Sequence, residues 1–165
     1  MSRLDHLKSK IYTSVYLIEK QLNIWRFQDK KIVFTNGCFD LLHFGHVDYL
    51  SEAADLGDIL VIGLNSDDSV RMLKGPKRPV NSQDTRSYML ASLSFVSAVI
   101  IFPEQTPIEL IKYIKPDILV KGSDYKPEEM VGYDVVTSYG GQVKTIELIP
   151  GYSTSNILQK IISSR

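Results

Sequence analysis

Short apolar runs alternate with helix-like segments along most of this chain. Five candidate strands, each followed within two residues by Asn, Gly or Pro, lie at residues 32–34, 58–64, 98–102, 117–121 and 142–148. Most of them lack polar alternation, which is typical of parallel strands buried on both faces. The order of strands and helices predicts an α/β fold, with a Rossmann-like, doubly wound, mostly parallel sheet of five strands.

Helix signals occupy the segments between these runs. Apolar spacing of three and four residues starts at Val47, and Ser82 provides an N-cap for a later helix. Thr106 to Glu109 has the pattern of a capping box with proline at the first helical position. The predicted helices cover residues 47–54, 67–73, 83–93, 107–113, 128–139 (with an early break at Gly132) and 156–162, the last capped by Ser153 or Thr154.

The first 28 residues form a separate pattern. Apolar side chains recur there at helical spacing, with Lys, Glu and Gln between them. The pattern predicts one amphipathic helix that packs on the domain or on a second subunit. We therefore expect an N-terminal helical extension at residues 1–28 and one α/β domain at residues 29–165.

Composition narrows the class of protein. The chain has 165 residues, 44% hydrophobic and 23% charged, with 19 basic and 19 acidic side chains. Because the formal net charge is zero, no overall field favours nucleic acid or a membrane surface. No apolar run is long enough to span a bilayer, and the N-terminus lacks a secretory pattern. With one cysteine, Cys38, an internal disulfide is excluded, and a cytoplasmic location is expected.

Two histidines stand where the first strand gives way to its helix. His43 and His46 are separated by Phe44 and Gly45, and imidazoles at this place can hold an anion together with the free N–H groups of the helix start. Gly45 lacks a Cβ, so a phosphate could approach the main chain closely. The alternative is a buried histidine pair beside a turn. A structural role suits Cys38 better than that of a nucleophile.

Other polar segments fall on the same predicted side of the sheet. Ligands of open parallel sheets bind at the carboxyl ends of the strands, where the loops with His43, Asp124 and Ser153 begin. Residues 74–81 are basic and contain two prolines and a glycine, which exclude regular structure. Neither a dinucleotide G-x-G-x-x-G nor a P-loop occurs in the sequence. Histidines, helix ends and the basic loop must therefore supply phosphate binding.

Several motifs carry a family resemblance. The sequence T-N-G-C-F-D-L-L from Thr35, followed by H-x-G-H, resembles the nucleotidyltransferase superfamily of cytidylyl- and adenylyltransferases. The ordered matches N-S-D-D-S-V from Asn65, L-K-G-P-K-R-P-V-N from Leu73, D-I-L-V-K-G-S-D-Y from Asp117 and G-Y-S-T from Gly151 are similar to the heptose 1-phosphate adenylyltransferases. Ser123 departs from that pattern, which often has glycine there. Residues 148–149 lack the arginine-threonine pair of glycerol-3-phosphate cytidylyltransferases.

The resemblance implies a role for each matching residue. His43, His46 and Lys77 would be catalytic, with His46 nearest to the α-phosphate. Sugar phosphate would contact Asp40, Asn65 and Tyr125. Asp40 also suits a hydrogen-bond acceptor in a turn, and that structural role suits it better than the role of a metal ligand. No metal ligand of the protein is implied, because Mg²⁺ would be bound through the ATP phosphates. Nucleotide would be bound by Asn36, Gly37, Cys38, Phe39, Gly45, Lys74, Arg78, Arg86, Gly122, Asp124, Ser153 and Thr154.

Some of these residues have simpler interpretations. Arg86 also suits an ordinary surface position on its helix, and Lys77 and Arg78 suit solvated charges on a polar loop. Asp124 also suits a turn cap, and Ser153 an ordinary N-cap that is compatible with phosphate binding.

The implied reaction transfers AMP from ATP to D-glycero-β-D-manno-heptose 1-phosphate. It would give ADP-heptose for the lipopolysaccharide core and release pyrophosphate. Two alternatives stay open: a glycerol-3-phosphate cytidylyltransferase or another sugar or cofactor phosphate nucleotidyltransferase, and a non-catalytic nucleotide-binding protein. The resemblance and the N-terminal pattern also predict a homodimer or a higher homo-oligomer.

Overall fold

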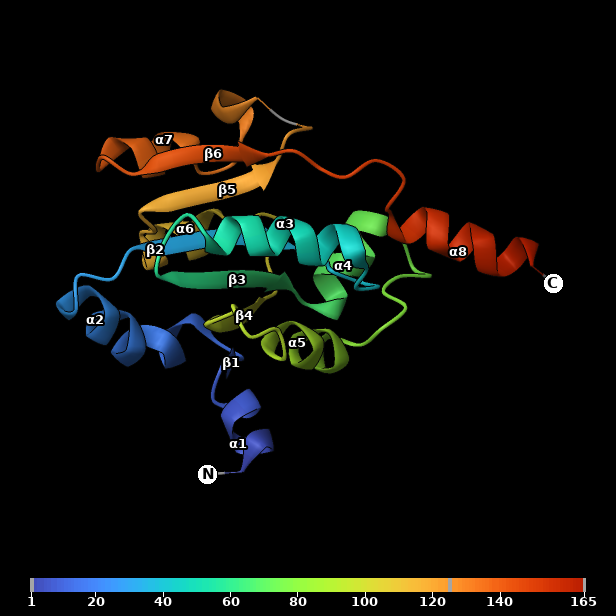
Figure 1. Cartoon of the computed structure of the whole chain (residues 1–165), viewed down its shortest axis with the longest axis horizontal. Coiled ribbons are helices and arrows are strands. Elements are labelled where there is room, and N and C mark those ends of the chain that lie inside the picture. Colours follow the sequence, from blue (N-terminus) through green and yellow to red (C-terminus); the bar gives the residue numbers. More distant parts are fainter. Residues whose placement is uncertain (1, 125, 165) are drawn as a thin grey trace.

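The computed structural model describes residues 2–124 and 126–164 of the chain. Within these residues six strands form one sheet in the order β1-β4-β3-β2-β5-β6, and every neighbouring pair is parallel (Figure 1). The α/β, Rossmann-like, doubly wound prediction is confirmed, but the predicted number of five strands is wrong. The strands are β1 (Ile11–Tyr12), β2 (Ile32–Gly37), β3 (Ile59–Asn65), β4 (Ala98–Phe102), β5 (Ile118–Gly122) and β6 (Gln142–Ile146).

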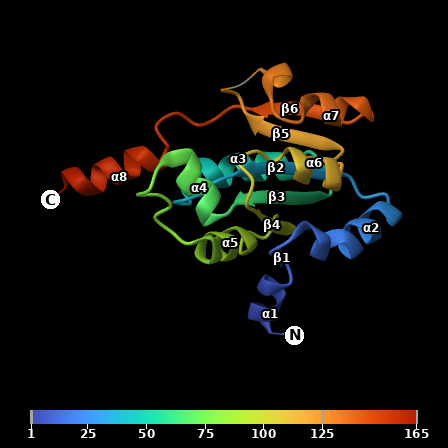
Figure 2. The ribbon, with the colours of Figure 1, turned by 180° about the vertical axis from the view of Figure 1, so that it is seen from behind.

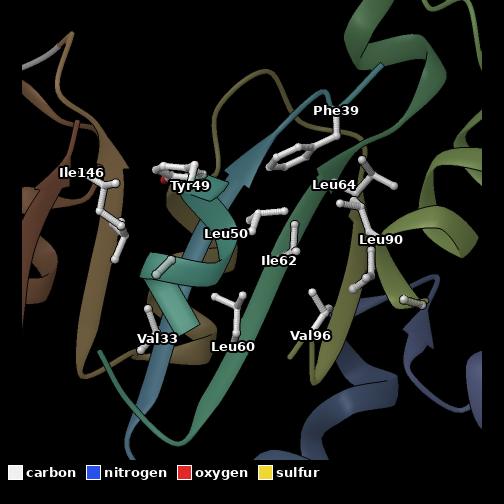
Figure 3. Close-up of a cluster of buried hydrophobic side chains, with 14 of the residues drawn as sticks. Val33, Phe39, Tyr49, Leu50, Leu60, Ile62, Leu64, Leu90, Val96 and Ile146 are labelled. Carbon is white, nitrogen blue, oxygen red and sulfur yellow. The ribbon is translucent and has the colours of Figure 1, made fainter. Parts of the chain in front are cut away.

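Helices cover both faces of the sheet. On one face, α3 (Phe44–Ala54) and α5 (Gln83–Ala91) pack on apolar strand residues, and Leu50 of α3 is completely buried there (Figure 3). On the other face, α2 (Glu19–Phe27), α6 (Ile108–Ile114) and α7 (Tyr133–Ser138) enclose a second core around Phe34. Figures 1 and 2 show α3 and α6 on opposite sides of the sheet. Burial on both faces explains why the strands read as continuous apolar runs.

The strand order reverses next to β2. From β2 the chain moves to β3 and β4 on one side, and it returns to β5 and β6 on the other. Val33 and Phe34 of β2 pair with Ile118 and Leu119 of β5, while the whole of β2 pairs with β3. The carboxyl ends of β2 and β5 therefore border the switch point, where ligands of such sheets bind.

The N-terminal segment differs from the single helix that was predicted for residues 1–28. It contains α1 (Arg3–Lys8), β1, a 3₁₀-helix η1 (Val15–Ile18) and α2. Ser14 ends the extended stretch, because its side chain accepts a hydrogen bond from the main-chain N–H of Tyr16 and caps η1. Ile18 and Leu22 are buried, so the segment packs on the domain. Whether residues 1–28 are separable from residues 29–165 stays a prediction.

Three further differences have local causes. The predicted helix 128–139 is divided into a 3₁₀-turn, η2 (Pro127–Glu129), and α7, because Gly132 has a φ of +96° between them. The capping box at 106–109 does not form, and α6 begins after Pro107 without a side-chain cap. The remaining helices, α4 (Asp67–Lys74) and α8 (Thr154–Ser163), agree with the sequence. Figures 1 and 2 show α8 extending away from the sheet, and none of its described residues is buried.

Helix length also bears on membrane insertion. Among the described residues, no helix combines the length and the apolar character needed to cross a bilayer.

Candidate functional site

A cavity of about 530 Å³ lies beyond the carboxyl ends of β2 and β5. The loop after β2, the start of α3, the basic loop, the end of β5 and the start of α8 form its walls. The structure thus brings together most of the residues predicted for the site. Those that line the cavity are Asn36, Gly37, Cys38, Phe39, Asp40, His43, Gly45, His46, Lys74, Arg78, Gly122, Asp124, Ser153 and Thr154.

The two histidines are stacked at the start of α3. Their ring centroids are 3.7 Å apart, with 18° between the planes. His43 is the N-cap of the helix, and its Nδ1 accepts a hydrogen bond of 3.3 Å from the main-chain N–H of His46. Because Nδ1 is the acceptor, the neutral ring of His43 carries its proton on Nε2, where it can be donated to a ligand.

Burial makes both imidazoles weak bases. Desolvation lowers the pKa of His43, and desolvation together with the charge of His43 lowers the pKa of His46 to about 4. Two stacked rings disfavour a second positive charge, so both are neutral near pH 7 without a ligand. An anion in the cavity would reverse this effect, because it stabilises the protonated form.

Three buried polar atoms lack a partner among the described residues, and all three belong to residues that line the cavity. They are Oδ1 of Asn36, Nδ1 of His46 and Nη2 of Arg78. Buried polar groups are nearly always hydrogen-bonded, so their clustering here indicates a site that a polar ligand completes.

The turn before α3 is tightly packed. Phe39 has a positive φ of 44°, rare for a residue with a large side chain, and its ring lies 5.2 Å from that of His46. A Cβ on Gly45 would lie 2.9 Å from Cβ of Tyr152 and 3.3 Å from Cε1 of His43. Glycine is therefore required at position 45 by the loop that precedes α8 and by the histidine ring, besides any ligand.

Asp40 anchors the basic loop. Its side chain is nearly inaccessible, with one oxygen accepting from Nε of Arg78 and the other accepting from the main-chain N–H groups of Val80 at 2.7 Å and Asn81 at 3.0 Å. Burial raises the pKa of Asp40, but the hydrogen bonds from Asn81, Arg78 and Val80 outweigh burial and hold it below the usual value. Its carboxylate is thus committed to the loop that carries Lys74 and Arg78 to the cavity.

Arg86 lies in the interior and does not line the cavity. Its Nε donates to the main-chain carbonyl of Asn81 at 3.0 Å, and its Nη1 donates to the carbonyls of Cys38 at 2.6 Å and Asn65 at 2.9 Å. Nη2 donates to Asp67 at 2.7 Å. The guanidinium therefore connects the turn after β2, the end of β3 and the basic loop, instead of facing the cavity.

Lys121, at the end of β5, lines the cavity although the sequence analysis did not assign it a role. Nζ donates to the main-chain carbonyl of Asn36 at 3.0 Å. Desolvation lowers the pKa of Lys121 to about 8, with a small opposing effect from Cys38. A lysine that ends an otherwise apolar strand was the available signal.

The start of α8 closes the cavity on the remaining side. Ser153 is its N-cap, and Oγ accepts a hydrogen bond of 3.0 Å from the main-chain N–H of Asn156. Tyr152, immediately before it, stacks over His43 with 6.4 Å between ring centroids. The free main-chain N–H groups and the partial positive charge of this helix start therefore face the same space as the histidines.

Besides Arg86, two predicted residues within the described part of the chain, Lys77 and Asn65, are not brought to the cavity. Lys77 is exposed on the basic loop and does not line the cavity. Asn65 is buried, and its Nδ2 donates to Oγ of Ser69 at 2.9 Å. Tyr125 lies outside the described residues. The roles of all the predicted site residues in binding and catalysis stay predictions.

The described residues contain no group of three or more His, Cys, Asp or Glu side chains arranged to hold a metal ion. The carboxylates at the cavity, Asp40 and Asp124, come from different walls, and Asp40 is fully engaged.

Comparison with known proteins agrees with this geometry. Residues 34–160 match the Cytidylyltransferase-like family. The chain is 57% identical over 141 residues to the bifunctional protein HldE of Syntrophotalea carbinolica, covering 86% of this chain and 29% of that protein. It is 55% identical over 143 residues to HldE of Campylobacter jejuni, covering 87% and 30%. The chain thus spans less than a third of the length of these relatives.

A solved structure shows the same fold. The crystal structure of the lipopolysaccharide core biosynthesis protein from Thermoplasma volcanium superposes with a TM-score of 0.59 at 28% identity. The likeness covers 73% of this chain and 97% of that one.

Proposed function

Because the chain belongs to the cytidylyltransferase-like family, we propose that it is a nucleotidyltransferase that transfers AMP from ATP to D-glycero-β-D-manno-heptose 1-phosphate. The single observation that carries the proposal is the stacked pair of His43 and His46 beside the helix starts of α3 and α8. They lie in a cavity whose lining has three polar atoms without a partner among the described residues. Such a site suits a chain of phosphates better than an apolar ligand.

The reaction needs positioning and charge stabilisation more than covalent chemistry from the protein. An oxygen of the sugar 1-phosphate attacks the α-phosphorus, the bond between the α-phosphorus and the oxygen that bridges to the β-phosphorus breaks, and pyrophosphate leaves with the electron pair. Nε2–H of His43 and the ring of His46 would bind phosphate oxygens, and the developing charge would favour protonation of His46. Lys74 and Arg78 would add positive charge from the basic loop, and Ser153 with Thr154 would hold the terminal phosphates.

Mg²⁺ would be bound through the ATP phosphates and would neutralise part of their charge. The cavity residues would then orient the phosphates around the ion. In this proposal the protein itself supplies no dedicated metal ligand.

The choice of substrate is supported by the motifs and by the relatives. The ordered matches from Asn65 to Thr154 are those of heptose 1-phosphate adenylyltransferases, and the structurally similar Thermoplasma volcanium protein is named for lipopolysaccharide core biosynthesis. A cytoplasmic homodimer with ATP and sugar phosphate as its small-molecule partners completes the proposal. No observation favours a cytidylyltransferase or a non-catalytic role over it.

A pyrophosphate-release assay tests the proposal. The purified chain is incubated with Mg²⁺, each of ATP and CTP, and a panel of acceptors that includes the heptose 1-phosphate, glycerol 3-phosphate and a pantetheine phosphate. We expect release with ATP and the heptose phosphate, and its loss in His46→Ala. Release with CTP and glycerol 3-phosphate alone would transfer the assignment to a sister enzyme, and ATP binding without release from any acceptor would indicate a non-catalytic protein.

A further inference from the structure

Lys121 is a half-buried cation at the cavity with unused hydrogen-bonding capacity. Among the described residues it forms no ion pair, because no carboxylate oxygen lies within 4.0 Å of its nitrogen. The carbonyl of Asn36 accepts a hydrogen bond from one of the three N–H groups of Lys121. A largely desolvated ammonium without an ion-pair partner is costly, so its place at a cavity indicates an anionic ligand.

Lys121 approaches the cavity from the face of the sheet opposite to the histidines. Side chains alternate along β5, where Val120 belongs to the core under α3 and Leu119 to the core on the α6 side. Lys121 therefore points to the same side as Leu119. It also lines a smaller cavity of about 190 Å³ together with Pro107, the N-cap of α6, and with Glu129 and Met130 at the end of η2.

Asn36, on the neighbouring strand β2, lies beside Lys121 on the same face of the sheet. Its Cβ lies 3.1 Å from the position that a Cβ on Gly63 would occupy, and side-chain atoms of Phe34 and Leu110 approach the same position. The side-chain oxygen of Asn36 is one of the buried atoms without a partner among the described residues. A second polar group is thus available beside Lys121 for a ligand on the α6 side.

The geometry of the transfer gives the part of the cavity beside Lys121 and Asn36 a specific role. This role rests on the proposed function. In an in-line displacement the attacking and leaving oxygens lie on opposite sides of the phosphorus. If the histidines contact the α-phosphate and, with the start of α8, the leaving pyrophosphate, the attacking phosphate arrives from the far side, where Lys121 lies. We propose that Lys121 is a catalytic residue that binds the phosphate of the acceptor and positions its oxygen for attack.

The pKa of about 8 supports this role, because the ammonium stays largely charged at neutral pH and a phosphate would stabilise that charge further. The smaller cavity beside Lys121 offers space for the rest of the acceptor next to its phosphate.

Steady-state kinetics of Lys121→Met, Lys121→Arg and the control Lys112→Met test the assignment. Lys112 is an exposed lysine of α6 paired with Glu109, away from the cavity. Varying the heptose 1-phosphate at saturating ATP, we expect Lys121→Met to raise the KM of the acceptor roughly 10- to 100-fold, the effect of one charge-assisted hydrogen bond. The KM of ATP should change less than about twofold, and Lys121→Arg should recover most of the loss. Lys121→Gln replaces the methionine variant if that one does not fold.

Two kinetic results would overturn the assignment. An unchanged acceptor KM would remove Lys121 from substrate binding, and a rise confined to the KM of ATP would place it on the nucleotide. Turnover by the wild type tests the proposed function separately. If no acceptor gives pyrophosphate, that function fails. Isothermal titration of the protein with the heptose 1-phosphate then tests whether Lys121 binds this phosphate. The assignment then stands if Lys121→Met weakens this binding but not that of α,β-methylene-ATP, and it falls otherwise.

Discussion

Replacing Arg86 by methionine separates a structural role from a phosphate-binding one. The side chain is fully buried and makes four hydrogen bonds, three of them to main-chain carbonyls of separate segments. Methionine keeps much of the volume and removes the charge and all four donors. The carbonyls of Cys38 and Asn65 would then lack these donors, and the carboxylate of Asp67 would lose its cation.

The expected loss of stability follows from those contacts. Hydrogen bonds to a charged group contribute about 1.5–3 kcal/mol each, but a sum over four would overestimate the effect because they share one desolvation cost. Asp67 keeps 25% of its side chain exposed and can be rehydrated. Breaking a buried ion pair by removing one partner costs about 3–5 kcal/mol, and we expect a loss in that range for Arg86→Met.

Urea unfolding provides the measurement. Trp25, the single tryptophan, is buried in the core on the α6 side, so its fluorescence reports global unfolding. With a slope of about 2 kcal/mol per molar urea, the midpoint should fall by about 1.5–2.5 M. Arg71→Met is the matched control, because Arg71 pairs with Asp68 on the exposed surface of α4, and it should cost less than about 1 kcal/mol.

The contrary outcome is equally specific. If Arg86→Met unfolds at the same urea concentration as Arg71→Met but binds α,β-methylene-ATP more weakly, Arg86 binds the phosphates. Its assignment as a buried residue that only connects three segments of the fold is then wrong.

Three further predictions concern the walls of the cavity. Gly45→Ala should reduce both activity and stability, because the new methyl group meets Tyr152; a variant as stable and active as the wild type would contradict the packing. Asp40→Asn should detach the basic loop and cost about 2 kcal/mol or more. The pKa of Asp40 is lowered in the folded state. The difference in free energy of unfolding between the wild type and Asp40→Asn should therefore be constant above about pH 4 and disappear as the pH falls through the folded pKa. Urea unfolding at several pH values measures it. Ser153→Ala should lose about 1 kcal/mol through the missing cap and raise the KM of ATP, and an unchanged KM would exclude α8 from phosphate binding.

The fold was predictable where burial alone decides the pattern. The five predicted strands overlap β2 to β6. In β2 to β5 both faces are covered, which leaves continuous apolar runs, whereas only Ile146 of the edge strand β6 is buried. β1 was not predictable from the same signal. It has two residues within a helix-like pattern, and it exists because β4 offers a free edge. Such pairing depends on tertiary structure and leaves no periodicity in the sequence.

The site was predictable in its location more than in its details. Loops at the carboxyl ends of parallel strands converge, and the histidines, the basic loop and the start of α8 do meet there. Arg86 and Lys121 show which site residues could not be predicted from the sequence. The positively charged arginine is fully buried, while a lysine within an apolar strand reaches the cavity. Both side chains donate to main-chain carbonyls of segments far away in the sequence, which the residues near Arg86 and Lys121 do not reveal.

Histidine NMR during titration with α,β-methylene-ATP and Mg²⁺ tests the central claim most directly. The chain contains three histidines, and His6 on α1 is an internal control outside the cavity. Bound phosphates should raise the pKa of His46 from about 4 and change the ring signals of both His43 and His46, while those of His6 stay unchanged. Saturating nucleotide that leaves the signals and pKa values of His43 and His46 as they are in the free protein would contradict the claim that this pair holds the triphosphate.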